Sequence, residues 1–142
     1  MRVRSFGLAD FWSSVPHDFF KLAPLVNRIG MVFVPVSDIE KAIHWYNSLF
    51  DVPLQQVSHQ GTIYNVPMQG DVGLILDGTR TAVKNSSQPL CFFWTDDIQV
   101  AYQFLEKNDV DIVREIEDIG SLYTLTFKDP DGNLLMVCQR NA

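Results

Sequence analysis

The chain has 142 residues, of which 46% are hydrophobic and 20% charged, and its formal net charge is −6. This length supports one domain with a core of its own. No apolar run approaches the roughly 20 residues that cross a bilayer. The 11 Lys and Arg residues are scattered, whereas nucleic acid requires a basic face. The composition therefore predicts a folded unit without a membrane or nucleic-acid partner.

Residues 1–28 form a segment that differs from the remainder of the chain. It is rich in aromatic residues, with Phe6, Phe11 and Trp12 near its start. Its basic opening is similar to a signal peptide, but Asp10 interrupts the apolar stretch, so we expect a cytoplasmic protein. We interpret residues 1–28 as an arm that packs on its own domain or on a partner subunit, with a lid over a pocket as the alternative.

An internal repeat organises the rest of the sequence. Aligning Phe33 with Phe92 also aligns Asp38 with Asp97 and Trp45 with Phe104. In each copy a short apolar run precedes a helix-start signal, Ser37 in the first and Asp96 in the second. The two halves are therefore predicted to be copies of one supersecondary unit.

Helical spacing of apolar residues predicts helices over residues 39–49 and 97–108. Alternating runs separated by turn residues predict three strands after each helix. The predicted strands are Leu54–His59, Thr62–Met68 and Val72–Leu76 in the first half, and Asp111–Ile116, Leu122–Phe127 and Leu134–Gln139 in the second. Each half is thus βαβββ, and we place the modules at residues 29–80 and 88–140 of a single domain spanning 29–140.

Candidate catalytic and metal-binding groups are sparse. Cys91 and Cys138 are the only cysteines, in no CxxC spacing, which favours buried reduced thiols over a disulfide framework. The histidines, His17, His44 and His59, are not in a metal-binding spacing such as HxH or HExxH. No nucleophile or general base can be assigned from these patterns.

The tandem modules, the Ser-Asp-Ile-Glu-Lys-Ala helix start at residues 37–42 and the Phe-x-Asp-Pro-Asp-Gly-Asn segment at 127–133 resemble the vicinal oxygen chelate superfamily. That group includes glyoxalase I, extradiol dioxygenases and bleomycin resistance proteins. The resemblance implies an α+β fold in which strands of both modules form a cup around a small ligand. It also implies a divalent cation in the metal-using members, held by the first and last strands of each module.

The residues at the implied ligand positions do not suit such a cation. They are Met31, Leu74, Leu90 and Met136. Leucine has no lone pair, and a thioether is a soft ligand that Mg²⁺ and Mn²⁺ do not select. We therefore expect no metal and no cofactor.

Strand alternation places residues two apart on one face, which extends the predicted site to neighbouring side chains. The predicted ligand-binding set is Met31, Phe33, Tyr64, Leu74, Leu90, Phe92, Trp94 and Met136. Such an apolar and aromatic cup is suited to binding a small apolar or aromatic molecule.

Three hypotheses follow for the function. The first is a metal-free binding protein, a homodimer, that holds a small molecule without turning it over. The second is a metal-dependent lyase, isomerase or dioxygenase whose ligands lie elsewhere. The third is a non-catalytic dimerisation or regulatory domain whose cup is filled by its own side chains.

Overall fold

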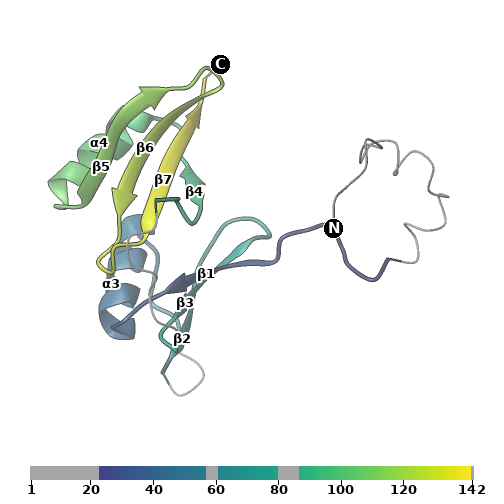
Figure 1. Ribbon diagram of the computed structural model, residues 1–142. Coiled ribbons are helices and arrows are strands. Elements are labelled where there is room, and N and C mark those ends of the chain that lie inside the picture. The colour runs from purple at the N-terminus through teal and green to yellow at the C-terminus, as the bar shows by residue number, and fades with distance from the viewer. Residues whose placement is uncertain (1–22, 57–60, 80–86, 142) are drawn as a thin grey trace.

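In the part of the chain that the structure describes, two β-sheets and two helices form the fold. The structure, a computed structural model, describes residues 23–56, 61–79 and 87–141 (Figure 1). In the first module the elements are β1 (Met31–Pro35), α3 (Ile39–Phe50), β2 (Ile63–Val66) and β3 (Gly73–Asp77). In the second they are β4 (Phe92–Trp94), α4 (Ile98–Lys107), β5 (Asp111–Asp118), β6 (Leu122–Lys128) and β7 (Leu134–Arg140).

The predicted α+β class and repeat are confirmed, except over part of one predicted strand. The first sheet has the order β1-β3-β2 and the second β4-β7-β6-β5, and in each the module's first strand lies parallel to its last. The strand predicted over Leu54–His59 is not formed at residues 54–56, and its remainder lies outside the described residues. Of the predicted arm, residues 1–22 also lie outside them.

The N-cap of each helix lies one residue after the predicted cap, although α3 begins at Ile39 as predicted. The N-cap of α3 is Asp38, whose carboxylate accepts a hydrogen bond from the Lys41 amide. The N-cap of α4 is Asp97, which accepts from the amides of Gln99 and Val100. Aspartate is as good an N-cap as serine, so local preference does not distinguish the adjacent candidates. Ser37 instead donates to Asp131 of the other module.

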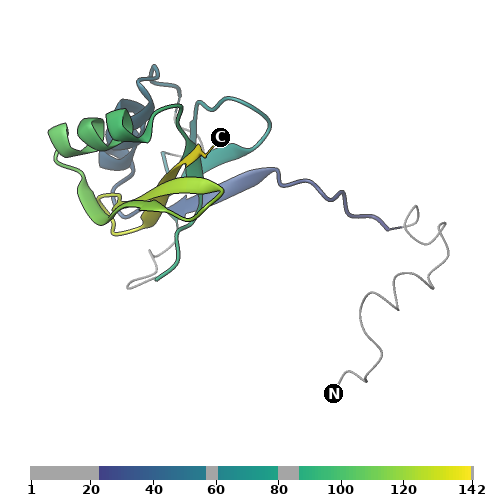
Figure 2. The same ribbon diagram turned by 90° about the horizontal axis from the view of Figure 1, so that it is seen from above.

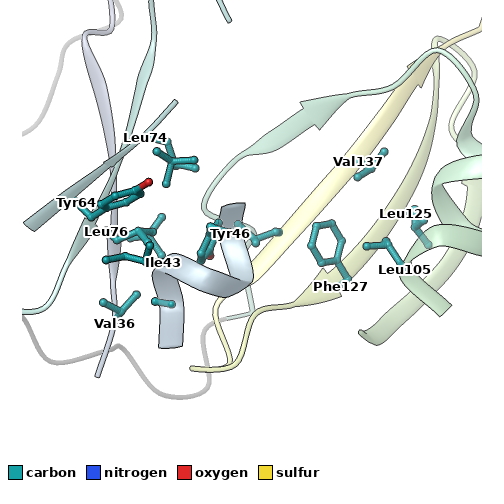
Figure 3. Close-up of a cluster of buried hydrophobic side chains, with 14 of the residues drawn as sticks. Val36, Ile43, Tyr46, Tyr64, Leu74, Leu76, Leu105, Leu125, Phe127 and Val137 are labelled. Carbon is teal, nitrogen blue, oxygen red and sulfur yellow. The ribbon is translucent and has the colours of Figure 1, made fainter. Parts of the chain in front are cut away.

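Helix α3 lies between the two sheets and forms part of the core of both modules (Figure 3). Its Ile43 and Tyr46 are buried with the strands of the first sheet. On its other side, Trp45 approaches Phe127 at 6.4 Å between ring centroids, and Phe50 packs edge-on against Phe93 at 4.9 Å. The described core is therefore one continuous cluster that spans both modules.

The segment Asp129–Asn133 joins the second module to the first. The Tyr46 hydroxyl donates to Asp129 Oδ2 at 2.6 Å, and Asn133 Nδ2 donates to the Pro35 carbonyl at 2.9 Å. Gly132 has a φ of 86°, a left-handed conformation that suits glycine at this turn. We call Asp129, Asp131 and Asn133 the inter-module clasp. Burial, and then the adjacent Asp129, raise the pKa of Tyr46 far above its usual range, so this hydroxyl stays a donor.

Residues 23–30 lead away from the strands, and every one of them is exposed (Figures 1 and 2). None of the helices in the described ranges has the length and apolar character needed to cross a membrane.

Removing the Tyr46 hydroxyl tests the importance of the inter-module clasp. We expect Tyr46→Phe to lower the free energy of unfolding by about 1–3 kcal/mol, because a buried carboxylate loses a charge-assisted hydrogen bond. The measurement is urea unfolding followed by circular dichroism. Tyr123→Phe is the matched control, since Tyr123 is half-buried and its hydroxyl has no hydrogen bond within the described residues. Equal free energies of unfolding for the two variants would show that the hydrogen bond from Tyr46 to Asp129 does not stabilise the fold.

Candidate ligand-binding faces

The four-stranded sheet has one face against the helices and one face turned outward. Leu125, Phe127 and Val137 belong to the core, so the residues that alternate with them point the other way. Strand register brings those residues side by side, pairing Phe92 with Met136 and Trp94 with Cys138. We define the outer face of this sheet by Phe92, Trp94, Thr124, Thr126, Met136 and Cys138.

The outer face of the four-stranded sheet presents aromatic surface to solvent. Phe92 is 43% exposed and Trp94 is 53% exposed. Their rings meet edge-to-face, with centroids 4.9 Å apart and an interplanar angle of 85°. Arg140 extends the group, because its guanidinium carbon lies 4.0 Å from the centre of the Trp94 ring. Leu90, which precedes β4, is 39% exposed.

The three-stranded sheet also has an apolar outer face. Met31 is 40% and Phe33 is 54% exposed, and register pairs Phe33 with Ile75 on β3. We define the outer face of this sheet by Met31, Phe33 and Ile75.

The structure corrects two of the predicted site residues. Register pairs Leu74 with Val32, and Leu76 with both Val34 and Tyr64. Leu74 is 2% exposed and Tyr64 is fully buried, both in the core on the helix side. Leu74 therefore does not share a face with Met31. The Tyr64 hydroxyl bonds Asn47 and is not available to a ligand.

The predicted cup between the modules is not closed within one chain. No strand of the first sheet has a Cα within 8 Å of a Cα in a strand of the second. Both sheets pack on the helices, which directs their outer faces away from the shared core. Within one chain the two outer faces are therefore separate surfaces.

Small polar groups form the floor of the outer face on the four-stranded sheet. Thr124 and Thr126 pair with Cys138 and Met136 on β7. Neither hydroxyl makes a hydrogen bond within the described residues, and no buried side-chain polar atom there lacks a partner. Thr124 and Thr126 are only 7% and 6% exposed, so the two hydroxyls lie at the bottom of the outer face with a hydrogen-bonding capacity that no described residue uses.

The two thiols are poorly suited to nucleophilic chemistry. Burial raises the pKa of Cys91 to about 11, and it also raises the pKa of Cys138. Because the thiolate is the reactive form, both groups are predominantly protonated at neutral pH.

A separate hollow of about 320 Å³ lies on the helix side, between α3 and α4. It is lined by Lys41, His44, Trp45, Ser48, Leu49, Phe104, Asn108 and Val110. His44 is exposed, as its position on the helix predicted, while His17 and His59 lie outside the described residues.

Comparison with known proteins identifies the family. Residues 28–137 match the model of the Glyoxalase/Bleomycin resistance protein/Dioxygenase superfamily. The chain belongs to this superfamily. A search of curated proteins finds no match.

Solved structures of the superfamily fold are similar to this chain. One is a glyoxalase/dioxygenase from Nostoc punctiforme, with a TM-score of 0.68 and 16% identity, over 85% of this chain and 97% of that one. Another is TnmS3, an antibiotic binding protein from Streptomyces sp. CB03234, with a TM-score of 0.64 and 22% identity, over 84% and 100% of the two chains. A virulence protein from Salmonella typhimurium has a TM-score of 0.61 and 21% identity, over 82% and 99%.

The residues of this superfamily member do not fit the divalent cation of its metal-using relatives. Met31, Leu90 and Met136 occupy three of the implied ligand positions, and register places Ile75 rather than Leu74 on the outer face of β3. No group of three or more His, Cys, Asp or Glu side chains suited to a metal occurs in the described ranges. These side chains offer thioethers and hydrocarbon where the cation requires oxygen or nitrogen donors.

Sequence reasoning missed Arg140. Alternation along β7 could have identified it, because alternation places Arg140 on the same face as Met136 and Cys138. Its contact with Trp94 depends on the parallel pairing of β4 with β7, which local sequence does not reveal.

Adding metal ions tests whether the side chains at the implied ligand positions can hold a divalent cation. We expect Mn²⁺, Ni²⁺ or Zn²⁺ to leave the melting temperature unchanged, because an ion that binds only the folded state would raise it. The measurement is differential scanning fluorimetry, with and without a chelator. A rise in melting temperature that a chelator reverses would contradict the expected lack of metal binding. If Met136→Ala abolished that rise, the ion would lie on the outer face of the four-stranded sheet.

Proposed function

We propose that this protein binds a small apolar or aromatic molecule on its outer sheet faces without a metal ion. The observation that carries the proposal is the exposure of Phe92 and Trp94 beside Met136, in place of a charged coordination site. Large aromatic rings on a surface mark a binding site, because each leaves apolar area in contact with water. TnmS3, which has a similar fold, is described as an antibiotic binding protein.

We further propose that a second copy of the chain completes each site. The outer face of the three-stranded sheet and that of the four-stranded sheet are both apolar and do not meet within one chain. A twofold axis would place each against its complement in the partner and form two equivalent cups. Residues 23–30 support this arrangement, because Leu25, Val26 and Ile29 are 88%, 70% and 68% exposed in a segment that leads away from the fold.

Binding of a neutral aromatic probe tests the location of the site. We expect phenylnaphthylamine to bind with enhanced fluorescence, and Trp94→Ala to weaken its affinity about tenfold, the equivalent of roughly 1.4 kcal/mol. Phe104→Ala is the matched control, since Phe104 is 41% exposed and lines the helix-side hollow.

Two outcomes would overturn the proposal. Weaker binding only in Phe104→Ala would place the site between the helices. Absence of probe binding, in a chain that forms dimers, would instead favour a dimerisation domain whose outer faces fill each other.

Placing a charge on the outer face of the three-stranded sheet tests the dimer. We expect wild-type protein to have the mass of two chains by light scattering and Phe33→Asp to have the mass of one, because an unpaired carboxylate in the interface is costly. Val100→Asp is the control, as Val100 is 59% exposed on α4. A wild-type monomer, or a Phe33→Asp dimer, would contradict the arrangement.

A further inference from the structure

We propose that the ligand of the four-stranded sheet is a flat aromatic molecule with an anionic group, and that Arg140 binds the anion. This inference rests on the proposed function, because it concerns the same outer face. It adds a class of ligand, aromatic carboxylates, sulfonates and phenolates, which the apolar residues alone do not select.

The position of Arg140 follows from strand geometry. On β7 it lies two residues beyond Cys138 and therefore on the same face. Cys138 pairs with Trp94 on β4, so the long side chain of Arg140 reaches the indole ring. Contact with the ring limits where the guanidinium can lie, at the edge of the exposed aromatic pair.

Arg140 keeps its hydrogen-bonding capacity. Within the described residues its guanidinium makes no hydrogen bond or ion pair, and its recorded side-chain interaction is with Trp94. A guanidinium has five N–H donors in its plane, in a geometry that matches a carboxylate or sulfonate. A bound anion would therefore receive donors that are already placed beside an aromatic surface.

Within the described residues no carboxylate forms an ion pair with Arg140, although Asp96 follows Trp94 by two residues on the segment that runs alongside β7. Glu117 lies on the same sheet, but β5 pairs with β6, so this residue is two strands from Cys138, roughly 10 Å away. A second copy that covers the outer face would desolvate Arg140, and a desolvated cation requires a negative partner.

The rest of the outer face suits the aromatic part of such a ligand. Phe92, Met136 and Thr126 lie in one row across β4, β7 and β6, and Arg114 continues the row on β5. Rings and a thioether at one end favour a flat hydrocarbon, and the Thr126 hydroxyl can bond a polar substituent. Arg114 adds a second cation at the far end of the row.

Two probes with the same rings test the inference. Anilinonaphthalene sulfonate carries a sulfonate that phenylnaphthylamine lacks. We expect wild-type protein to bind the sulfonate about tenfold more tightly, and Arg140→Gln to lose this preference while its affinity for the neutral probe stays within about twofold. Raising the salt concentration should weaken binding of the sulfonate only.

The controls separate charge from structure. Lys107→Gln removes the same charge from the end of α4 and should leave both affinities unchanged. Arg140→Lys keeps the charge but loses the planar donor pair, so we expect part of the preference to remain. Circular dichroism checks the fold of each variant.

Each failure has a distinct meaning. If the neutral probe binds at the Trp94 face but the sulfonate has no advantage, or Arg140→Gln keeps that advantage, this inference is overturned and the proposed function stands. If neither probe binds, both are overturned.

Discussion

The fold depends on one helix that contributes to the part of the core in each module. Helix α3 packs against the three-stranded sheet through Ile43 and Tyr46 and against the second module through Trp45 and Phe50. The Tyr46 hydroxyl crosses the same boundary to reach Asp129. Since each sheet buries the face that meets the helices, its other face must turn outward. The position of the candidate site is thus a consequence of where the hydrophobic core forms.

The outer faces keep the strand arrangement of the superfamily but carry apolar side chains at the implied metal-ligand positions. The Asp129–Asn133 segment, which marks the superfamily in the sequence, links the modules through Tyr46 and Pro35. Its structural role does not require a metal ion, so it can be kept when the ligand positions change. With Met31, Leu90 and Met136 at those positions, the proposed site would bind through surface area and shape in place of metal coordination. In the proposed site, hydrogen bonds from Arg140 would orient the ligand, which apolar contacts alone cannot do.

Much of the fold could be predicted because its signals are local. The spacing of Ile39, Ala42 and Ile43 identified α3, and alternation identified most of the strands. The N-cap of α3 was predicted one residue early because Ser37 and Asp38 are both good caps, and only the contact with Asp131 gives Ser37 another partner. Met31, Phe33, Phe92, Trp94 and Met136 lie on outer faces, and their role in binding stays a prediction. Leu74 and Tyr64 lie in the core, because alternation gives two sets of residues without saying which set is buried.

Residue type and spacing alone were enough to identify the family, the two modules and the lack of oxygen and nitrogen donors at the implied metal positions. The packing of the sheets on the helices established which face of each strand is buried. Leu74, which pairs with Val32 on β1, lies on the buried face. Tertiary structure also decided that the two outer faces lie apart and that Arg140 lies over Trp94. These features join residues far apart in the chain, and no local pattern encodes such distances.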